Sequence, residues 1–432
     1  MSMFENDVLT GPVENTLRGN KSTDIFALQP LTSDAKYIHE HKKHEDTRNT
    51  HGKVTATAKT LYKDMHNIAD LINKSFLHMT VEPTNGTAYA SQYPVYAALE
   101  NLSIESGRQL VWEITGRELQ LLWELSPMSL RSQSALEKRL VGHKDSDKMA
   151  TLVGLTIPDG EVTKYVAELV GLPWSLSQGH CLRTVIALGT TLELCIKPND
   201  VSSWSFSSIN GEATPITKEM VTFDLYSDTT TLMRGDRDIM RSIADNPRGL
   251  HVPVFTLQTI SKRFETANAD TFVKFDSIDI SEFRNVTTGL ILAFLPDTAI
   301  DGTAMNTTDD RETLIDQFGY YTKKDLFEDL NVTVNSFEMY KPHHNDFDTY
   351  HRVHAWDGAI GRVPANGAYT IIPIGRDIAN ITHVPTSFAI PAYEKVFISG
   401  KISVPSPGTL YIFNWCMNYI TYSNDMLGRT WM

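Results

Sequence analysis

The sequence predicts an all-β protein with two β-sandwich domains. Short segments in which apolar and polar residues alternate recur along most of the chain, and a period of two is typical of strands with one buried face. The chain has 432 residues, which exceeds the size of one core, and two domains of about 180–200 residues each fit this length. With 41% apolar and 21% charged residues, disordered and fibrous classes are excluded.

Residues 1–55 are predicted to form an arm. They are polar, contain turn-forming pairs and show no sustained periodicity, so we expect them to become ordered only against a neighbour. From residue 56 to about 74, apolar residues recur at helical spacing, and these are Leu61, Met65, Ile68 and Ile72. This spacing favours a helix that ends near Asn73, followed by a strand that starts near Ser75.

The clearest local pattern lies between residues 95 and 125. Alternating apolar residues on both sides of Gly107 predict two strands joined by a tight turn. Thr115 and Glu118 have the spacing of a capping box, in which each side chain bonds a backbone N–H of the other residue. The helix behind this box should bury one face, made of Leu119, Leu122 and Trp123.

Strands continue to about residue 215, apart from a charged insert at 137–148. The turn-rich stretch 198–215 is predicted to join two domains, at 56–212 and 213–432. A second series of strands is predicted at Val221–Tyr226, Val252–Ile260, Phe272–Ile280, Gly289–Phe294, Val332–Tyr340, Tyr369–Ile374, Lys395–Val404 and Thr409–Tyr419. Eight strands fit a jelly roll, which closes two four-stranded sheets over one core, and helix-like patterns at 234–250 and 297–330 predict insertions in its loops.

Five motifs occur in the order found in one known family: Asp70-Leu71-Ile72 before a strand that ends at Pro83, Ile104-Glu105-Ser106-Gly107-Arg108-Gln109 between two strands, Leu172-Pro173-Trp174, Phe283 before the apolar strand 289–294, and Asn414-Trp415-Cys416-Met417-Asn418-Tyr419. In these motifs the chain resembles the double jelly-roll major capsid proteins of the large nucleo-cytoplasmic and membrane-containing double-stranded DNA viruses. Arg108 stands where the family has a second turn glycine, and the family's Asn-His-Pro is absent.

The resemblance implies two jelly-roll β-sandwich domains side by side, with short helical insertions in loops. It also implies a structural major capsid protein, which trimerises into pseudo-hexameric capsomers that tile an icosahedral shell. The implied partners are other copies of the chain in the homotrimer and in neighbouring capsomers, minor capsid or cement proteins, and an internal virion membrane. The implied location is the virion capsid, with assembly in the host cell cytoplasm or nucleus.

Charge and targeting features agree with such a role. The net charge is −13, from 39 basic and 52 acidic residues, and this argues against direct nucleic-acid binding. Residues 36–63 are the most basic stretch and are interpreted as a solvated arm, with contact to an acidic partner or a membrane leaflet as the alternative. We find no apolar run near the about 18 residues of a membrane span and no secretory signal. Three scattered cysteines, Cys181, Cys195 and Cys416, suit a reducing compartment.

Two groups of histidines are the strongest candidates for a chemical site. One group lies in the arm and consists of His39, His41, His44 and His51. The other surrounds three aspartates and consists of His343, His344, His351 and His354 with Asp346, Asp348 and Asp357. Imidazole and carboxylate groups are ligands of zinc and non-haem iron. Because the second group lies in a polar loop, ordinary surface histidines are the favoured interpretation, and we assign no metal, cofactor or catalytic residue.

The alternative function is that of a carbohydrate-binding or carbohydrate-active β-sandwich protein, such as a lectin or a glycosidase. Trp204 and Trp356 could form a sugar platform, although core packing explains most tryptophans. Glu118, Glu124 and Glu168 could in principle pair as glycosidase carboxylates, but such residues are commoner on helix faces and strand edges. There is no Gly-x-Ser-x-Gly motif and no phosphate loop. We therefore predict a protein that is not an enzyme.

Overall fold

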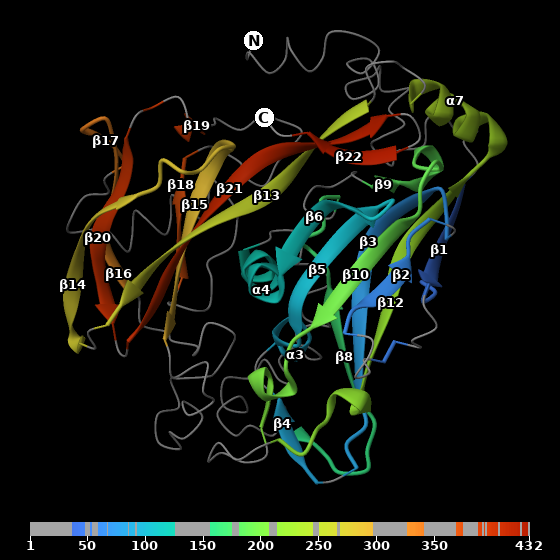
Figure 1. Ribbon diagram of the computed structural model, residues 1–432, viewed down its shortest axis with the longest axis horizontal. Coiled ribbons are helices and arrows are strands. Elements are labelled where there is room, and N and C mark those ends of the chain that lie inside the picture. The colour runs from blue at the N-terminus through green and yellow to red at the C-terminus, as the bar shows by residue number, and fades with distance from the viewer. Residues whose placement is uncertain are drawn as a thin grey trace.

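Two β-sandwiches stand side by side in the computed structural model, so the all-β prediction is confirmed (Figure 1). The first sandwich lies on the right in Figure 1 and the second on the left, and short helices lie in the connections. The structure describes residues 37–47, 52–53, 59–66, 68–84, 86–90, 93–125, 156–174, 181–206, 214–244, 250–265, 268–296, 326–340, 369–374, 388–390, 393, 395–404, 407–423 and 426–430.

The first sandwich consists of two facing sheets, named here sheets A and B. Sheet A contains, in spatial order, β1 (Tyr37–Lys43), β12 (Val221–Leu232), β3 (Leu71–Val81) and β8 (Thr163–Glu168), and β9 (Leu182–Arg183) pairs with β3. Sheet B contains β2 (Leu61–Asp64), β10 (Leu192–Pro198), β5 (Leu99–Ser106) and β6 (Gln109–Thr115). Alternate side chains point between the sheets, where Leu77, Leu194 and Leu225 are fully buried in one apolar core.

Smaller elements cover the ends of this sandwich. Sheet C, at the lower end in Figure 1, contains β11 (Ser205–Phe206), β4 (Ala88–Ala90) and β7 (Thr156–Ile157). The helices are α3 (Pro94–Ala97), α4 (Gly116–Leu125) and α7 (Arg234–Ala244), with single 3-10 turns η3 (Thr184–Ile186), η4 (Val201–Ser203) and η5 (Lys218–Met220). Across the described residues, none of the helices has the length and apolar character needed to span a membrane.

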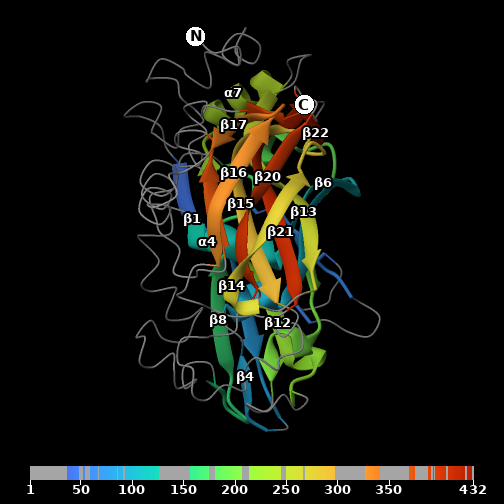
Figure 2. The same ribbon diagram turned by 90° about the vertical axis from the view of Figure 1, so that its left-hand side faces the viewer.

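The second sandwich consists of sheets D and E. Sheet D contains β13 (Leu250–Phe264), β21 (Gly408–Ser423), β15 (Val286–Pro296) and β18 (Tyr369–Pro373), and β19 (Phe388–Ala389) and β22 (Met426–Thr430) pair with β15 and β21. Sheet E contains β14 (Asn268–Asp279), β20 (Val396–Val404), β16 (Phe327–Val334) and β17 (Phe337–Tyr340). Its separate core includes Leu292, Leu330 and Ile398, all fully buried. Figure 2 shows sheet E from outside.

The predicted hairpin and helix at 95–125 are confirmed. β5 and β6 pair through a turn in which Gly107 has φ 56° and Arg108 has φ 69°, and two positive φ angles are the signature of a type I′ hairpin turn. The Thr115 backbone N–H donates to Glu118 Oε2 over 2.8 Å, and the Glu118 N–H donates to Thr115 Oγ1 over 3.3 Å. The helix face behind this capping box is buried and consists of Leu119, Leu122 and Trp123.

The helix predicted between residues 56 and 73 is wrong. Leu61 lies in β2 of sheet B, whereas Ile72 lies in β3 of sheet A, and both are fully buried. The chain crosses from one sheet to the other between these strands. Apolar residues of two different strands therefore reach the same core, and their helical spacing is a coincidence of this crossing.

The strand predicted at 221–226 belongs to the first sandwich. β12 pairs with β3 from Val221 opposite Val81 to Thr230 opposite Leu71, and on its other side it pairs with β1. The sheets therefore divide after β12 and not at the turn-rich stretch 198–215. We accordingly propose a boundary between the sandwiches near the end of α7, with β1 as part of the first one.

Two further predictions are refined in the second half of the chain. The strand predicted at 332–340 is a hairpin of β16 and β17, because Asn335 and Ser336 adopt φ values of 46° and 74° and reverse the chain. The helix-like pattern at 297–330 included Leu326 and Leu330. Leu326 lies directly before β16 and Leu330 lies within it, so this end of the pattern belongs to a strand. The pattern at 234–250 does contain a helix, α7. The remaining insert predictions, at 137–148 and 297–325, fall outside the described residues.

Candidate assembly surfaces

The two sandwiches share a continuous apolar core where they meet. Strands β13 and β21 are long, and in Figure 1 they extend from the second sandwich across the top of the first. Phe255 and Trp415 point from sheet D toward the first sandwich, with ring centroids 5.7 Å apart at an angle of 81°. They line a small cavity together with Ile114 of β6 and Leu122 of α4. Apolar burial of this extent makes the pair of sandwiches one block.

Two polar contacts cross the same joint. The Thr259 hydroxyl of β13 donates to Glu118 Oε1 over 3.2 Å, so the capping box of α4 also holds the second sandwich. Exclusion of water raises the pKa of the Glu118 carboxyl, and its hydrogen bonds to Thr115 and Thr259 oppose this. The Arg183 backbone N–H donates to the Tyr422 hydroxyl over 3.2 Å. The Arg183 guanidinium is buried and lies 5.9 Å from the centroid of the Tyr422 ring. These contacts fix the orientation of the sandwiches.

An N-terminal strap joins the edges of sheets A and B. We use this name for residues 37–47, of which 37–43 form β1. After β1, the His44 N–H donates to the Leu225 carbonyl in sheet A over 2.9 Å, and the Thr47 N–H donates to the Tyr62 carbonyl in sheet B over 3.0 Å. The predicted arm is therefore wrong for residues 37–47, which belong to the first sandwich.

The strap buries two titratable side chains. The Lys63 ammonium is fully buried, lies 2.6 Å from Asp46 Oδ1 and donates to the Phe223 carbonyl over 2.8 Å. The His44 ring lies between the Asp64 carbonyl, 2.7 Å from Nδ1, and the Ser227 hydroxyl, 2.8 Å from Nε2. Burial lowers the pKa of His44 to about 4, so the ring is neutral at physiological pH.

Stacked rings cover part of the outward face of sheet A. The ring of His41 lies parallel to that of Tyr226 with centroids 5.5 Å apart, and the His78 ring centroid is 4.4 Å from the same tyrosine. Nδ1 of His41 lies 2.9 Å from Oδ1 of Asp228. Partial burial, and next the proximity of His41, lower the pKa of His78. The face therefore combines half-exposed aromatic surface with charged groups.

Exposed apolar side chains gather at two corners of the molecule. The α7 corner consists of Ile38, Met233 and Ile239, which are 57%, 50% and 48% exposed. The β17 corner consists of Phe337, Met339 and Tyr393, which are 78%, 39% and 40% exposed. Tyr393 is assigned to this corner because the N–H of Asn335, two residues before Phe337, donates over 2.9 Å to the carbonyl of Lys395, two residues after Tyr393.

No family model and no curated protein sequence matches the chain. Its structure, however, is similar to the PBCV-1 virus capsid model, with a TM-score of 0.67 and 11% identity over 93% of this chain and 98% of the other. The Faustovirus major capsid protein matches with a TM-score of 0.62 and 11% identity over 91% and 92% of the two chains. PBCV-1 VP54, fitted into a reconstruction of the virophage Sputnik, matches with a TM-score of 0.68 and 13% identity over 93% and 98%.

The chain has the double jelly-roll fold of these capsid proteins. The similarity covers both sandwiches and the joint between them, because more than nine tenths of each chain is matched. The order of the sequence motifs therefore predicted the correct fold, from Asp70-Leu71-Ile72 to the C-terminal strand. It did so although the chain is only 11–13% identical to these solved structures.

The described histidines of the arm group, His39, His41 and His44, differ in their exposure. His39 and His41 lie on the exposed edge strand β1, whereas His44 is buried. His51 and the group at 343–354 lie outside the described residues. Within the described part of the chain, no three or more His, Cys, Asp or Glu side chains come together in a way that could hold a metal ion.

The residues considered for carbohydrate chemistry have other partners. Glu118 caps α4, and the Glu168 carboxylate is buried, with Oε1 3.4 Å from the Lys74 ammonium. Trp204 is only 1% exposed, so it packs in the core and cannot serve as a sugar platform. Trp356 and the Glu124 side chain lie outside the described residues. The strap, the joint and the two corners were missed by sequence reasoning, since each depends on strand pairing between distant segments.

Proposed function

We propose that this protein is a viral major capsid protein that assembles as a homotrimer. The observation that carries the proposal is the continuous apolar core at the joint between two jelly rolls that stand side by side. This arrangement is similar over more than nine tenths of the chain to the PBCV-1 capsid and the Faustovirus major capsid protein. A trimer of such blocks places six sandwiches around one axis. Its outline is close to hexagonal, and hexagonal blocks can tile an icosahedral shell.

The proposal includes the partners and the location of the protein. Its main partners are other copies of the chain, within the trimer and in neighbouring capsomers. Its other partners are minor capsid or cement proteins and an internal virion membrane. Its location is the virion capsid, which is assembled in the host cytoplasm or nucleus. The net charge of −13 supports a shell role, because a protein that packs nucleic acid needs a cationic surface.

Sedimentation of the purified full-length protein tests the oligomeric state. We expect a species of three times the 48.5 kDa chain mass at micromolar concentration. An obligate interface of this kind buries well over roughly 2,000 Å², so the trimer should persist on dilution. A protein that sediments only as a monomer at micromolar concentration would contradict the proposal.

A further inference from the structure

We propose that Lys63 and Asp46 form an amide bond within the folded chain, which joins the N-terminal strap covalently to sheet B. The reacting groups are the ε-amine of the lysine and the carboxyl group of the aspartate, so the product is an isopeptide bond. This inference does not depend on the proposed function, because it concerns a reaction inside one chain. The bond keeps the strap beside β2 even when the surrounding strand pairing opens.

The backbone holds the two reacting side chains opposite each other. Asp46 of the strap and Lys63 of β2 form an antiparallel β-bridge, so their side chains are direct cross-strand neighbours. The Lys63 nitrogen lies 2.6 Å from Asp46 Oδ1. It also donates to the Phe223 carbonyl over 2.8 Å, which fixes the end of the lysine side chain. Two groups held at contact distance react as if each were present at a very high concentration.

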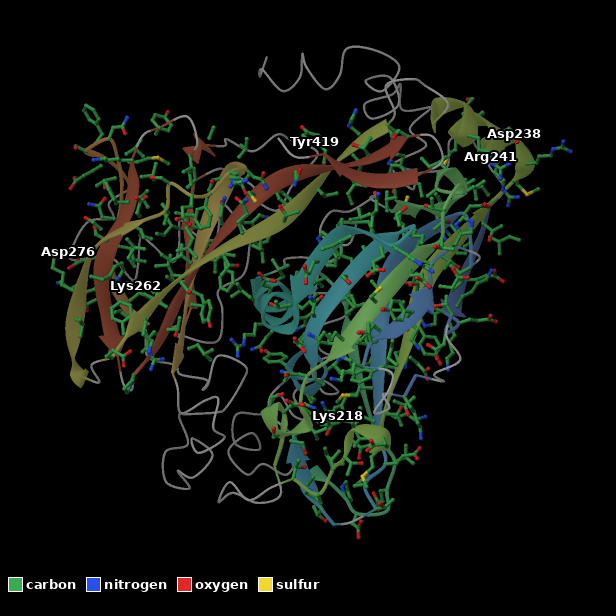
Figure 3. The ribbon with its side chains drawn as sticks, in the orientation of Figure 1. Lys218, Asp238, Arg241, Lys262, Asp276 and Tyr419 are labelled. Atoms are coloured by element: carbon green, nitrogen blue, oxygen red, sulfur yellow. The ribbon has the colours of Figure 1, made fainter. Side chains whose placement is uncertain are left out.

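Burial distinguishes this pair from an exposed pair of the same type. The Lys63 side chain is fully buried, and that of Asp46 is 12% exposed. Lys218 and Asp200 lie 2.5 Å apart but are 46% and 75% exposed, and Figure 3 shows Lys218 near the lower end of the first sandwich. An amine attacks a carboxyl group only when both are uncharged, and a site without water favours the uncharged pair more than an exposed site does. The buried pair therefore has the surroundings that this reaction needs.

Asp224 can carry the proton that the reaction moves. Its Oδ1 lies 4.0 Å from the Lys63 nitrogen and 2.9 Å from the Lys43 nitrogen, so the Lys43 ion pair holds the carboxylate in place. Asp224 belongs to β12, and the strap, β2 and β12 thus contribute one group each. A carboxylate beside the amine can accept a proton from it and return that proton to a leaving oxygen.

The reaction releases one water molecule and needs no other reactant. A proton first passes from the Lys63 ammonium to the Asp46 carboxylate, which gives an amine and a carboxylic acid. The Lys63 nitrogen then attacks Cγ of Asp46 and forms the C–N bond, while Asp224 takes a proton from that nitrogen. Asp224 returns the proton to the departing hydroxyl group, the C–O bond breaks and water leaves. Freshly folded chains hold the ion pair, and the bond forms from it slowly because the uncharged pair is the minor form.

Mass spectrometry of the full-length protein tests the bond. After incubation of the folded protein at neutral pH, we expect a species that is lighter than the sequence mass by one water molecule. Proteolysis should then release a branched peptide that contains both Lys63 and Asp46. The peptides around Lys218 and Asp200 should stay linear, which makes them an internal control. An unchanged mass after several days, or a loss of water found only in linear peptides, would overturn the inference.

Substitutions test the role of each group. Lys63→Arg keeps a positive charge beside Asp46 but removes the amine, so no branched peptide should form. Asp224→Asn keeps both reacting groups and should slow bond formation at least about tenfold, because the proton carrier is lost. Lys43→Gln is the matched control, since it also removes the Lys43–Asp224 ion pair but keeps the Asp224 carboxylate. Equal rates in these last two variants would overturn the role of Asp224, and the branched peptide of the unaltered protein decides the bond itself, whichever variants fold.

Discussion

The two sandwiches differ in the polar groups that they bury. Among the described residues, the buried side chains of the Lys, Arg, His, Asp and Glu types all lie in the first sandwich, and they are His44, Lys63, Glu168 and Arg183. The buried polar side chains of the second sandwich are neutral, for example Asn414 and Thr287. A buried charge is costly unless it is paired, whereas a neutral group needs only hydrogen bonds. The first sandwich should therefore be sensitive to its strap and to pH, and the second to packing alone.

Deletion of the strap should break the first sandwich and have the largest effect. A chain that starts at Ala56 lacks β1, His44 and Asp46, so Lys63 loses its nearest carboxylate and the edge of sheet A loses its paired strand. Loss of one partner of a buried ion pair costs about 3–5 kcal/mol, and the lost strand pairing adds to this. We expect this chain to be unfolded or aggregated by circular dichroism. The matched control starts at Lys36 and keeps the strap, so a folded chain from Ala56 would show that the strap is dispensable.

Asp46→Asn isolates the charge within the strap. The substitution keeps the shape of the side chain but leaves Lys63 with only the more distant Asp224 carboxylate, whose Oδ1 lies 4.0 Å from the ammonium. We therefore expect a loss of about 3 kcal/mol in the free energy of unfolding, the lower end of the cost of a broken buried ion pair. In the second sandwich, Asp329 pairs with Lys401 on the partly exposed outer side of sheet E. There Asp329→Asn should cost less than about 1 kcal/mol. Chemical denaturation of both variants decides the comparison, and equal losses would contradict it.

A packing defect in the second sandwich should lower the free energy of unfolding by the same amount at every pH tested. Leu330 is fully buried in the apolar core between sheets D and E. Leu330→Ala should lower the free energy of unfolding by about 2–5 kcal/mol, because it removes apolar contacts and leaves a cavity. The loss should be the same at pH 7 and at pH 5. A loss that changes between these pH values would show that this core is coupled to a titrating group.

His44 should make the first sandwich less stable in acid. Burial lowers its pKa from 6.5 to about 4, so the unfolded chain binds more protons than the folded chain between these two values. Stability is therefore full above pH 6.5 and falls as the pH drops toward 4, by about 3 kcal/mol in total. His44→Gln should remove this part of the pH dependence. Hydrogen exchange at β1 and β12 measures it, and an unchanged pH profile in the variant would refute the assignment.

The smallest effect is expected at the β5–β6 turn. Arg108 adopts φ 69°, a left-handed conformation that favours glycine over other residues. Arg108→Gly should raise the free energy of unfolding by about 0.5–1 kcal/mol, since it relieves this strain. Gly107→Ala, at φ 56°, should have the opposite sign. Thermal unfolding of the two variants should therefore shift in opposite directions, and shifts in the same direction would be inconsistent with the turn geometry.

Sequence reasoning found the features that depend on local pattern. The tight turn at Gly107, the Thr115–Glu118 capping box and most strands of the second sandwich were predicted, because neighbouring residues alone determine them. The pairing of β12 with β3 was missed, since it joins Val221 to Val81 across a long segment of chain. β1 was missed because it is a polar edge strand whose side chains are mostly exposed, so its composition is that of an arm.

The surfaces were harder to predict than the fold. Lys63 looks like an ordinary surface lysine in the sequence, and only the fold of the strap buries it beside Asp46. The α7 corner likewise combines Ile38 with residues about 200 positions later, which meet only because β1 pairs with β12. Features made by distant pairing have no local signature, so the sequence alone could not locate them.

Electron microscopy of the purified full-length protein tests the central claim most directly. If the joined sandwiches form one block that trimerises, images should show three-fold symmetric particles with a hexagonal outline, in which six sandwiches surround the axis. Isolated two-lobed particles of one chain each, under conditions where the protein is folded, would contradict the account.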